Sequence, residues 1–387
     1  MSIGHLRRMA VPVAVAVAAA ALAACGSDSG GSSAKGDGGG AKAAGTSCPA
    51  ARRAVDKATK PLQLTLPGEA VPMSKIAGKS VWYIAPDMSL PFIAAIAHGF
   101  KDAAQAAGLK PTIFDGKGNV NTFNQGVSSA VSQGADGILL QGINPALVSG
   151  PLQQATKQKI AIVDSLNGGP DQPLTGGVQA HVTVDYRLGG ALMADYAATS
   201  TACKGQAIFF TSSIYNIYKD MVAGFKAELA RVCPACQLAD VVNVAPTDLA
   251  TKLGGLTSTA AARHPDAKAF VAAYDGQVQF MEQALQERGG DGLAIISHDG
   301  VTSNLKQIQG GAGLQTMDVS NPPNEAMGWA EVDQLGRLLT KMEPVQDALP
   351  QQVFVKANIA GDPEDVAALF PGYADYQSKW KQLWGVG

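Results

Sequence analysis

Short apolar runs rich in β-branched and aromatic residues alternate with longer segments of helical periodicity from Val81 onward. Ten runs are predicted to be strands, at 81–86, 110–116, 136–141, 160–165, 181–185, 206–212, 236–244, 268–275, 293–300 and 314–320. Helical patterns fill the gaps, for example at 91–107, 122–133, 146–157, 188–199 and 215–231. Because this alternation is typical of β-α-β units, it predicts an α/β fold with parallel sheets that helices cover on both faces.

The predicted strands divide into two sets of five. HVTVDYRLGG (181–190) completes the first set, and the second set begins with the same spacing. One long sheet is the alternative, but two doubly wound, Rossmann-like lobes fit the spacing better. We expect an N-terminal lobe of residues 79–184 with about 322–348, and a C-terminal lobe and tail of 185–321 with about 349–387. A multi-crossing hinge near residues 185, 320 and 350 would join the lobes, with a ligand cleft between them at the carboxyl ends of the strands.

The N-terminus has the layout of a secretory signal at residues 1–24. Arg7 and Arg8 precede an apolar run of about 14 residues, which is shorter than the roughly 20 that a membrane-spanning helix needs. LAAC (22–25) resembles a bacterial lipoprotein lipobox, which implies cleavage after residue 24 and lipidation of Cys25. A plain signal peptide with an incidental cysteine is the alternative. Residues 25–50 are nearly all small or polar and predict a flexible, lipid-anchored tether, which an N-terminal extension follows at 51–78.

Charge and cysteine content narrow the classes of function. Lys and Arg total 30 against 32 Asp and Glu without a basic block, which argues against nucleic-acid binding. Besides Cys25 there are Cys48, Cys203, Cys233 and Cys236, and an even number outside the cytosol favours disulfides. A redox or metal-binding CxxC motif is the alternative for Cys233 and Cys236, but both follow a predicted helix C-terminus, where a reactive thiolate is disfavoured. We expect Cys203 to pair with Cys233 or Cys236.

Catalytic signatures are absent from the sequence. There is no G-x-S-x-G elbow, and the five histidines form no H-E-x-x-H motif. AGKS (77–80) looks like the end of a phosphate-binding loop, but Met73 stands where the first glycine belongs. The sequence therefore predicts a protein without enzymatic activity, resident cofactor or metal.

Polar and aromatic side chains stand at the ends of the predicted strands, where doubly wound sheets bind their ligands. These candidates are Asp87, with Ser89 beyond it, Asp164, Tyr274, Asp275 and Asp299. Their oxygens can accept hydrogen bonds from ligand hydroxyl groups in a cleft that holds little water. A purely local turn is the alternative wherever an aspartate precedes a glycine, as at Asp299-Gly300.

Several motifs occur in the order found in one known family. IAPDMSLPFIAAIAHGFKDAAQAAG (84–108) is followed by GADGILLQ, IAIVDS, VTVDYRLGG, AAYDG and SHDG. Over about residues 79–358 the chain thereby resembles the sugar branch of type I periplasmic binding proteins, and it is similar to ribose-binding proteins. The resemblance implies a substrate-binding lipoprotein of an ABC transporter, with Phe92 stacking on the sugar and Asp164 and Asp299 as ligand-binding carboxylates. It also implies that Ser320 or Asn321 takes the place of a hinge glutamine.

The pocket residues depart from the pattern of that family. Ser165 stands where close relatives have an arginine, and Met221 or a neighbour replaces a second arginine. SSIYNIYKD (212–220) supplies Tyr215, Asn216 and Tyr218 at the mouth of the second lobe, and Tyr274 adds another ring. We therefore expect a flatter, more aromatic pocket than the ribose type, for a less hydroxylated ligand.

Together these features predict a lipid-anchored receptor on the outer face of the cell membrane. Acting as a monomer, it would trap a small solute between its lobes and deliver the solute to an ABC permease and its ATPase. The alternatives are a sensory module for a membrane kinase, a binder of a nucleoside or quorum-type signal, and an exported enzyme. In the tail, Tyr373, Tyr376, Trp380 and Trp384 have helical spacing and are interpreted as packing residues.

Overall fold

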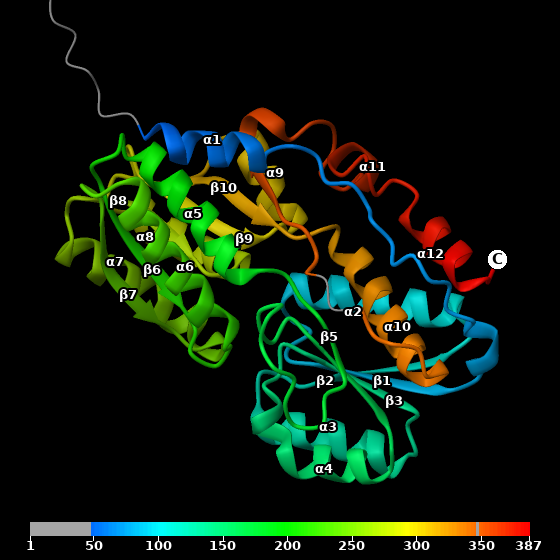
Figure 1. Cartoon of the computed structure of the whole chain (residues 1–387). Coiled ribbons are helices and arrows are strands. Elements are labelled where there is room, and N and C mark those ends of the chain that lie inside the picture. The colour runs from blue at the N-terminus through cyan, green and yellow to red at the C-terminus, as the bar shows by residue number, and fades with distance from the viewer. Residues whose placement is uncertain (1–47, 346–347) are drawn as a thin grey trace, which may run out of the picture. The chain divides into compact units, whose positions relative to one another are not determined.

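The computed structural model describes residues 48–345 and 348–387 (Figure 1). The predicted signal segment, the lipidation site Cys25 and most of the predicted tether lie outside the described residues. Within them, strands and helices alternate as the apolar pattern predicts, and the strands form two sheets. None of the helices in this described part is both long and apolar enough to cross a membrane.

The N-terminal lobe is built on a parallel sheet with the strand order β2-β1-β3-β4-β5. Its strands are β1 (Ser80–Ala85), β2 (Lys110–Asp115), β3 (Gly137–Gln141), β4 (Ala161–Ser165) and β5 (Ala180–Val182). One face is covered by α2 (Pro91–Ala106) and α10 (Asn324–Thr340), and the other by α3 (Val120–Ser132) and α4 (Ser149–Lys157). Because successive strand residues point to opposite faces, Tyr83 and Trp82 belong to two separate apolar clusters.

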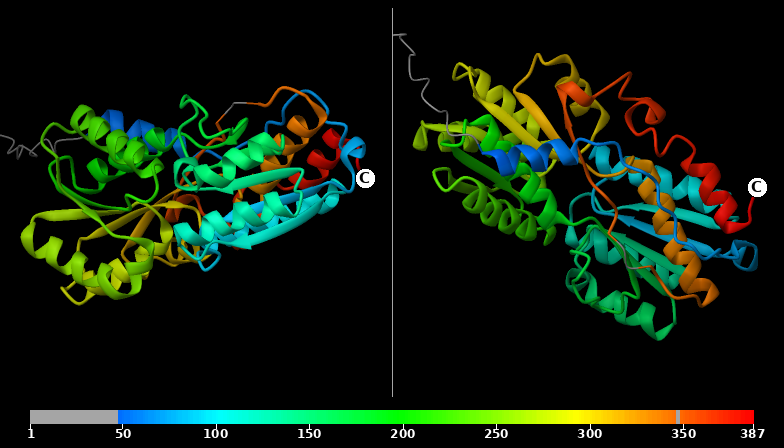
Figure 2. Two further views of the ribbon diagram at one scale, coloured as in Figure 1. Left: turned by 90° about the horizontal axis from the view of Figure 1, so that it is seen from below. Right: turned by 45° about the horizontal axis from the view of Figure 1, so that its top comes forward.

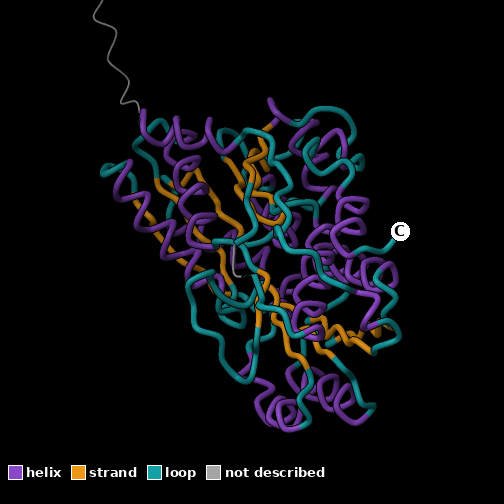
Figure 3. Tube along the Cα trace, turned by 45° about the vertical axis from the view of Figure 1, so that its right-hand side comes forward, coloured by secondary structure: helices purple, strands orange, loops and turns teal. Residues whose placement is uncertain are grey.

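The C-terminal lobe is built on a second sheet, with the order β11-β10-β9-β8-β6-β7. Its strands are β6 (Gln206–Thr211), β7 (Gln237–Asn243), β8 (Ala267–Ala272), β9 (Ala294–Asp299), β10 (Gln315–Ser320) and β11 (Gln352–Val355). Its main helices are α5 (Tyr186–Ser200), α6 (Ile217–Val232), α7 (Gly254–Arg263), α8 (Val278–Gln286) and α9 (Thr302–Gly310). α5 and α6 pack together on one face, and Figure 3 shows the strands enclosed by helices in each lobe.

All ten predicted strands are present, and the predicted α/β fold with two doubly wound lobes is confirmed. β11 is the strand that the apolar pattern missed. It has four residues and pairs antiparallel with β10 at the edge of the sheet. A run this short contains too few positions to show the periodicity of a strand.

Several segments connect the two lobes, and three of them lie where the hinge is predicted (Figure 2). They are the segments from β5 to α5, from β10 to α10 and from α10 to β11. Val184 of the first forms a parallel bridge with Leu349 of the third, and the Leu349 N–H donates to the Thr183 carbonyl at 2.8 Å. Two of the connections are thus hydrogen-bonded to each other, which limits how independently they can bend.

The two ends of the described chain add further packing across the lobes. α1 (Pro49–Ala58) packs on α5 of the C-terminal lobe, whereas the short helix η1 (Met73–Ile76) packs on α10 of the N-terminal lobe. α12 (Tyr376–Trp384) also packs on α10, with the Trp384 and Trp329 rings stacked at a centroid distance of 5.2 Å. The expected assignment of the whole tail to the C-terminal lobe is therefore wrong for α12. Its buried aromatic face fits α10, while β11 earlier in the same segment joins the C-terminal sheet.

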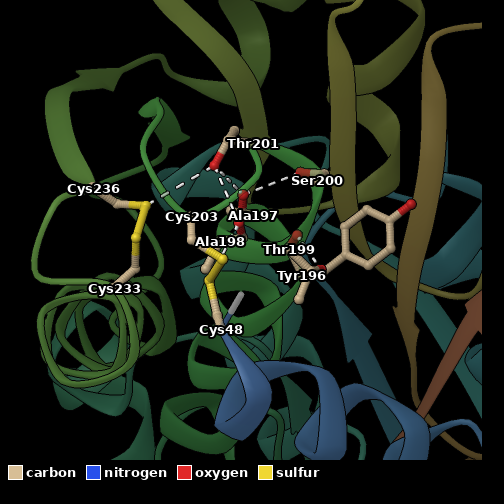
Figure 4. Close-up of a disulfide and its surroundings, with 10 residues drawn as sticks. All are labelled: Cys48, Tyr196, Ala197, Ala198, Thr199, Ser200, Thr201, Cys203, Cys233 and Cys236. Carbon is tan, nitrogen blue, oxygen red and sulfur yellow. Dashed lines mark hydrogen bonds between the residues drawn. A yellow bond between two sulfur atoms is a disulfide. The ribbon is translucent and has the colours of Figure 1, made fainter. Parts of the chain in front are cut away.

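The disulfides also differ from the expected pairing. Cys48 is bonded to Cys203 and Cys233 to Cys236, so the expectation that Cys203 pairs with Cys233 or Cys236 is wrong (Figure 4). The reason is that α1 lies along α5, which brings the Cys48 and Cys203 Cα atoms to 5.8 Å. The other two cysteines follow the last residue of α6, as the helical pattern predicts.

Candidate ligand-binding site

A cavity of about 390 Å³ lies between the two lobes, at the carboxyl ends of strands from both sheets. Segments that follow β1, β3 and β4 line it from the N-terminal lobe, and segments that follow β6, β8 and β9 line it from the C-terminal lobe. The carboxyl edge is where doubly wound sheets bind their ligands, so this cavity is the candidate binding site.

Four tyrosines of the C-terminal lobe form one wall of the cavity, called here the tyrosine wall. Tyr186 begins α5, Tyr215 follows β6, Tyr218 lies in the first turn of α6 and Tyr274 follows β8. The Tyr218 and Tyr274 rings are stacked, with centroids 5.5 Å apart and planes 9° apart. Tyr215 and Tyr186 meet Tyr218 edge-on at 5.6 and 6.5 Å. Because each ring packs against another, the wall is assembled before a ligand arrives.

Phe92 lines the cavity from the N-terminal lobe. Pro91 takes the first position of α2, where an N–H group would have no hydrogen-bond partner within the helix, and Phe92 follows directly. Leu90, Ile93 and Leu166 extend the apolar surface around it. The cavity therefore has an aromatic ring on one lobe and the tyrosine wall on the other.

Two polar side chains of the lining are buried without hydrogen-bond partners. Gln141, the last residue of β3, is fully buried, and neither its Oε1 nor its Nε2 has a partner among the described residues. The hydroxyl of Tyr274 is also buried and unpaired. An unsatisfied buried polar group costs about 1–3 kcal/mol, so these atoms indicate a ligand that completes their hydrogen bonds.

Asp275 belongs to a buried acidic network beneath the cavity. Ser297 Oγ lies 2.6 Å from Asp275 Oδ1 and 2.8 Å from Asp318 Oδ2, and the Val301 N–H donates to Asp275 Oδ2 at 2.7 Å. One hydroxyl proton cannot satisfy two carboxylates, and burial together with the nearby Asp318 raises the pKa of Asp275 well above its usual range. The acids and other candidate ligands among the described residues form no group that could hold a metal ion.

Asp299 ends β9 in a strained backbone conformation with φ 125°, a region that side chains other than glycine rarely adopt. Gly300 follows at φ 74°, where an added Cβ would lie 1.8 Å from Ser320 Oγ. His298 places Nδ1 3.1 Å from Asp299 Oδ1 and Nε2 2.7 Å from Gln351 Nε2. Burial lowers the pKa of His298 to about 4, so the neutral ring accepts from Gln351 and donates to Asp299.

Six of the predicted site residues line the cavity. They are Phe92, Tyr215, Tyr218, Tyr274, Asp275 and Asp299. Asp87 and Ser89 lie on the loop after β1, where the Ser89 hydroxyl donates to Asp87 Oδ1 at 2.6 Å. Burial raises the pKa of Tyr215, and the charge of Asp87 adds to the rise, which places this carboxylate within reach of the tyrosine wall. Asn216 is exposed just before α6.

Like Asp87, Ser89 and Asn216, four further predicted residues do not line the cavity. They are Asp164, Ser165, Ser320 and Asn321. Asp164 is buried at the end of β4, and burial raises its pKa to about 6. Ser165 follows Asp164 in β4 and therefore points to the opposite face of the strand, where it is buried near Glu331 of α10. The Ser320 hydroxyl donates to the Asn321 carbonyl at 2.9 Å within the hinge connection.

Sequence reasoning missed two prominent residues of the lining. Tyr186 follows Asp185 at the end of the fifth predicted strand, and Gln141 is the last residue of the run DGILLQ. Because both stand at strand ends, the rule that identified Asp299 could have identified them.

The lobes also touch each other outside the cavity. Gln172, in the loop before β5, donates from Nε2 to Asp220 Oδ2 of α6 at 2.5 Å. A direct hydrogen bond between the lobes forms only when they are close together. The two lobes are therefore in direct contact through these side chains.

Comparisons with known proteins agree with this geometry. Residues 81–343 match the family described as a periplasmic binding protein domain. The ribose import binding protein RbsB of Salmonella typhimurium is 21% identical over 242 residues, which cover 62% of this chain and 79% of that protein. An ABC transporter solute binding protein from Burkholderia graminis, solved in complex with D-arabinose, has a TM-score of 0.65 at 22% identity, over 73% of this chain and 96% of that chain. A sugar ABC transporter structure from Yersinia enterocolitica has a TM-score of 0.69 at 16% identity, over 83% of this chain and 99% of that chain.

Proposed function

Because the chain belongs to the periplasmic binding protein domain family, we propose that it is the extracytoplasmic solute receptor of an ABC-type importer. As a binding protein it returns its ligand unchanged, and no catalytic step is part of its role. Its solute is a sugar or a sugar-like compound, in line with the ribose and D-arabinose named for two of the similar proteins. The closed receptor delivers that solute to a membrane permease, which an ATPase drives.

The observation that carries this proposal is the composition of the cavity between the lobes. Phe92 and the tyrosine wall provide aromatic rings on opposite lobes, and Gln141 and Tyr274 present buried polar atoms that have no partner among the described residues. A sugar-like solute has the matching surface, because its C–H face stacks on rings while its hydroxyl groups complete hydrogen bonds.

Closure of the lobes couples binding to recognition by the permease. A solute that contacts both lobes binds the closed form more tightly than the open form, and it shifts the population toward closure by that difference. Three residues connect β5 to α5 and three connect β10 to α10, and Val184 of the first connection forms a bridge with Leu349 of the segment before β11. The lobes therefore move as bodies about these connections.

We also propose that lipid on Cys25 holds the receptor at the outer face of the cell membrane. The lipobox-like LAAC (22–25) and the small and polar residues after it support this. A flexible chain of about 22 residues has a root-mean-square reach of roughly 25 Å. Such a tether would keep the receptor close to its permease while leaving it free to turn.

The function is tested by thermal unfolding of the chain from Gly26 onward, against a panel of pentoses, hexoses, polyols and nucleosides. A ligand at one hundred times its dissociation constant adds about 2.7 kcal/mol to the free energy of unfolding, which raises the melting temperature by several degrees. A response to a sugar or polyol supports the proposal. A response to nucleosides alone contradicts the sugar assignment, and a silent panel contradicts the proposed class of solute.

Two matched variants connect the responding ligand to the cavity. Tyr274→Phe removes an unpaired hydroxyl in the lining, so the dissociation constant should rise about three- to tenfold in titration calorimetry. Tyr83→Phe is the control, because its hydroxyl is also buried and unpaired but lies in the core of the N-terminal lobe. Equal dissociation constants for the two variants would place the ligand somewhere else.

A further inference from the structure

The charged side chains that line the cavity are all of one sign. Asp275 and Asp299 are acidic, and the described residues of the lining include no Lys, Arg or His. Asp87, on the loop after β1, adds a third carboxylate, which together with burial raises the pKa of Tyr274. Arg187 and Lys219 are neighbours of the tyrosine wall in sequence, but both are exposed and neither lines the cavity. Among the described residues of the lining, a ligand therefore meets acidic side chains but no basic ones.

Asp299 is the carboxyl that remains available to a ligand. Asp275 is engaged by Ser297 and the Val301 N–H. Asp299 receives one side-chain hydrogen bond among the described residues, from His298, although it is only 4% exposed. A carboxylate has about four lone-pair positions, so most of its acceptor capacity is unused.

The tyrosine wall lies beside this carboxyl. The Tyr186 ring lies 5.5 Å from the ring of His298, measured between centroids, and His298 contacts Asp299. Burial raises the pKa of Tyr218 and of Tyr186, and the carboxyl of Asp299 adds to the rise. The faces of aromatic rings carry partial negative charge and attract cations, and the attraction reaches about 2 kcal/mol where water is excluded. Rings and carboxylate thus favour the same kind of group, a cation.

The unpaired polar atoms describe the rest of the ligand. Gln141 offers one acceptor and two donors, Tyr274 offers a hydroxyl, and Gln279 and Asn304 add amide groups to the lining. Hydroxyl groups of a ligand match these side chains, because a hydroxyl group also both donates and accepts hydrogen bonds. The lining therefore favours a ligand that carries hydroxyl groups at one end and a positive charge at the other.

We propose that the solute is a protonated amine that also carries hydroxyl groups, of the chemical class of amino sugars and amino polyols. Its ammonium group lies against Asp299 and the tyrosine wall, and its hydroxyls reach Gln141 and Tyr274. This inference rests on the proposed function and names the ligand class. An ammonium group has three donors and no acceptor, which complements a carboxyl whose one side-chain donor among the described residues is the neutral His298. Burial and the nearby Asp318 raise the pKa of Asp299 well above its usual range, and an ammonium group beside this carboxyl would favour its charged form, which a neutral sugar cannot do.

The test compares ligands that differ in charge but little in size. Titration calorimetry with the chain from Gly26 onward uses two pairs, D-glucosamine with D-glucose and 1-amino-1-deoxysorbitol with sorbitol. We expect the amine of at least one pair to bind about tenfold or more tightly than its neutral partner. Tighter or equal binding of the neutral partners overturns the inference and leaves the proposed sugar receptor standing. If neither amine nor neutral sugar binds, both the inference and the proposed function fail.

A pair of variants identifies the carboxyl responsible. Asp299→Asn keeps the size of the side chain and, since asparagine tolerates positive φ better than most residues, suits the backbone at this position. This variant should bind the amine and its neutral partner with dissociation constants whose ratio is close to one. Asp164→Asn is the control, because it removes another buried carboxyl at a strand end outside the lining. An amine preference that survives in Asp299→Asn overturns the inference, and thermal unfolding verifies that each variant is folded.

Discussion

Glu331 of α10 is a buried acid that should make the free energy of unfolding depend on pH. Its carboxyl is fully buried between the helix and the sheet of the N-terminal lobe, and neither oxygen has a hydrogen-bond partner among the described residues. Burial raises the pKa of Glu331 from 4.5 to about 8. The nearby Ser165 hydroxyl is too poorly placed for a hydrogen bond, but it offsets part of the rise.

The raised pKa makes the folded state less stable as the pH rises. Between pH 4.5 and 8 the folded protein holds a proton that the unfolded chain has lost, so the free energy of unfolding falls with pH in this range. Each pH unit costs about 1.4 kcal/mol, which amounts to a loss of about 3 kcal/mol at pH 7. Glu331→Gln removes the titrating group while keeping its shape, and it should abolish this loss.

Urea unfolding of both proteins at pH 5 and pH 7.5 measures the effect. The stability gained by Glu331→Gln over the native chain should be about 3 kcal/mol larger at pH 7.5 than at pH 5. Glu325→Gln is the control, because it removes an exposed carboxyl from the same helix. A gain of the same size at both pH values would refute the reasoning, because it would mean that Glu331 carries no raised pKa in the folded protein.

Two further predictions concern the disulfide of α1 and the contact between the lobes. Cys48 and Cys203 are separated by 155 residues, and replacing both with serine should lower the free energy of unfolding by about 2–4 kcal/mol in denaturant titrations; an unchanged value would mean that α1 is held by packing alone. Asp220→Ala removes the hydrogen bond from Gln172, so ligand dissociation in stopped-flow experiments should become about three- to tenfold faster. Unchanged dissociation would show that this contact does not stabilise the closed form.

Much of the fold could be predicted because apolar periodicity is a local property of the chain. The runs VWYIAP and DGILLQ identify β1 and β3 on their own, because fully buried parallel strands are continuously apolar. The pairing of Cys48 with Cys203 could not be predicted, because it depends on the packing of α1 against α5. The packing of α12 on α10 could not be predicted for the same reason. The aromatic face of α12 indicates that the helix is buried, but it does not indicate which element covers that face.

The site residues that stand at the ends of strands could be predicted from the sequence. Asp299 and Tyr274 lie at the cavity because the carboxyl ends of parallel strands share one edge of the sheet. Ser165 does not line the cavity, because neighbouring residues of a strand point to opposite faces and Ser165 follows directly after Asp164. The unpaired atoms of Gln141 could not be inferred, since the absence of a partner becomes apparent only when both lobes are assembled around the side chain.

A crystal structure with the ligand identified by thermal unfolding would show directly whether the cavity between the lobes is the binding site. We expect the ligand to lie between the lobes, in contact with Phe92 and at least one ring of the tyrosine wall, and to form a hydrogen bond with Asp299. A ligand bound outside this cavity, or one with none of these rings within contact distance, would contradict this expectation.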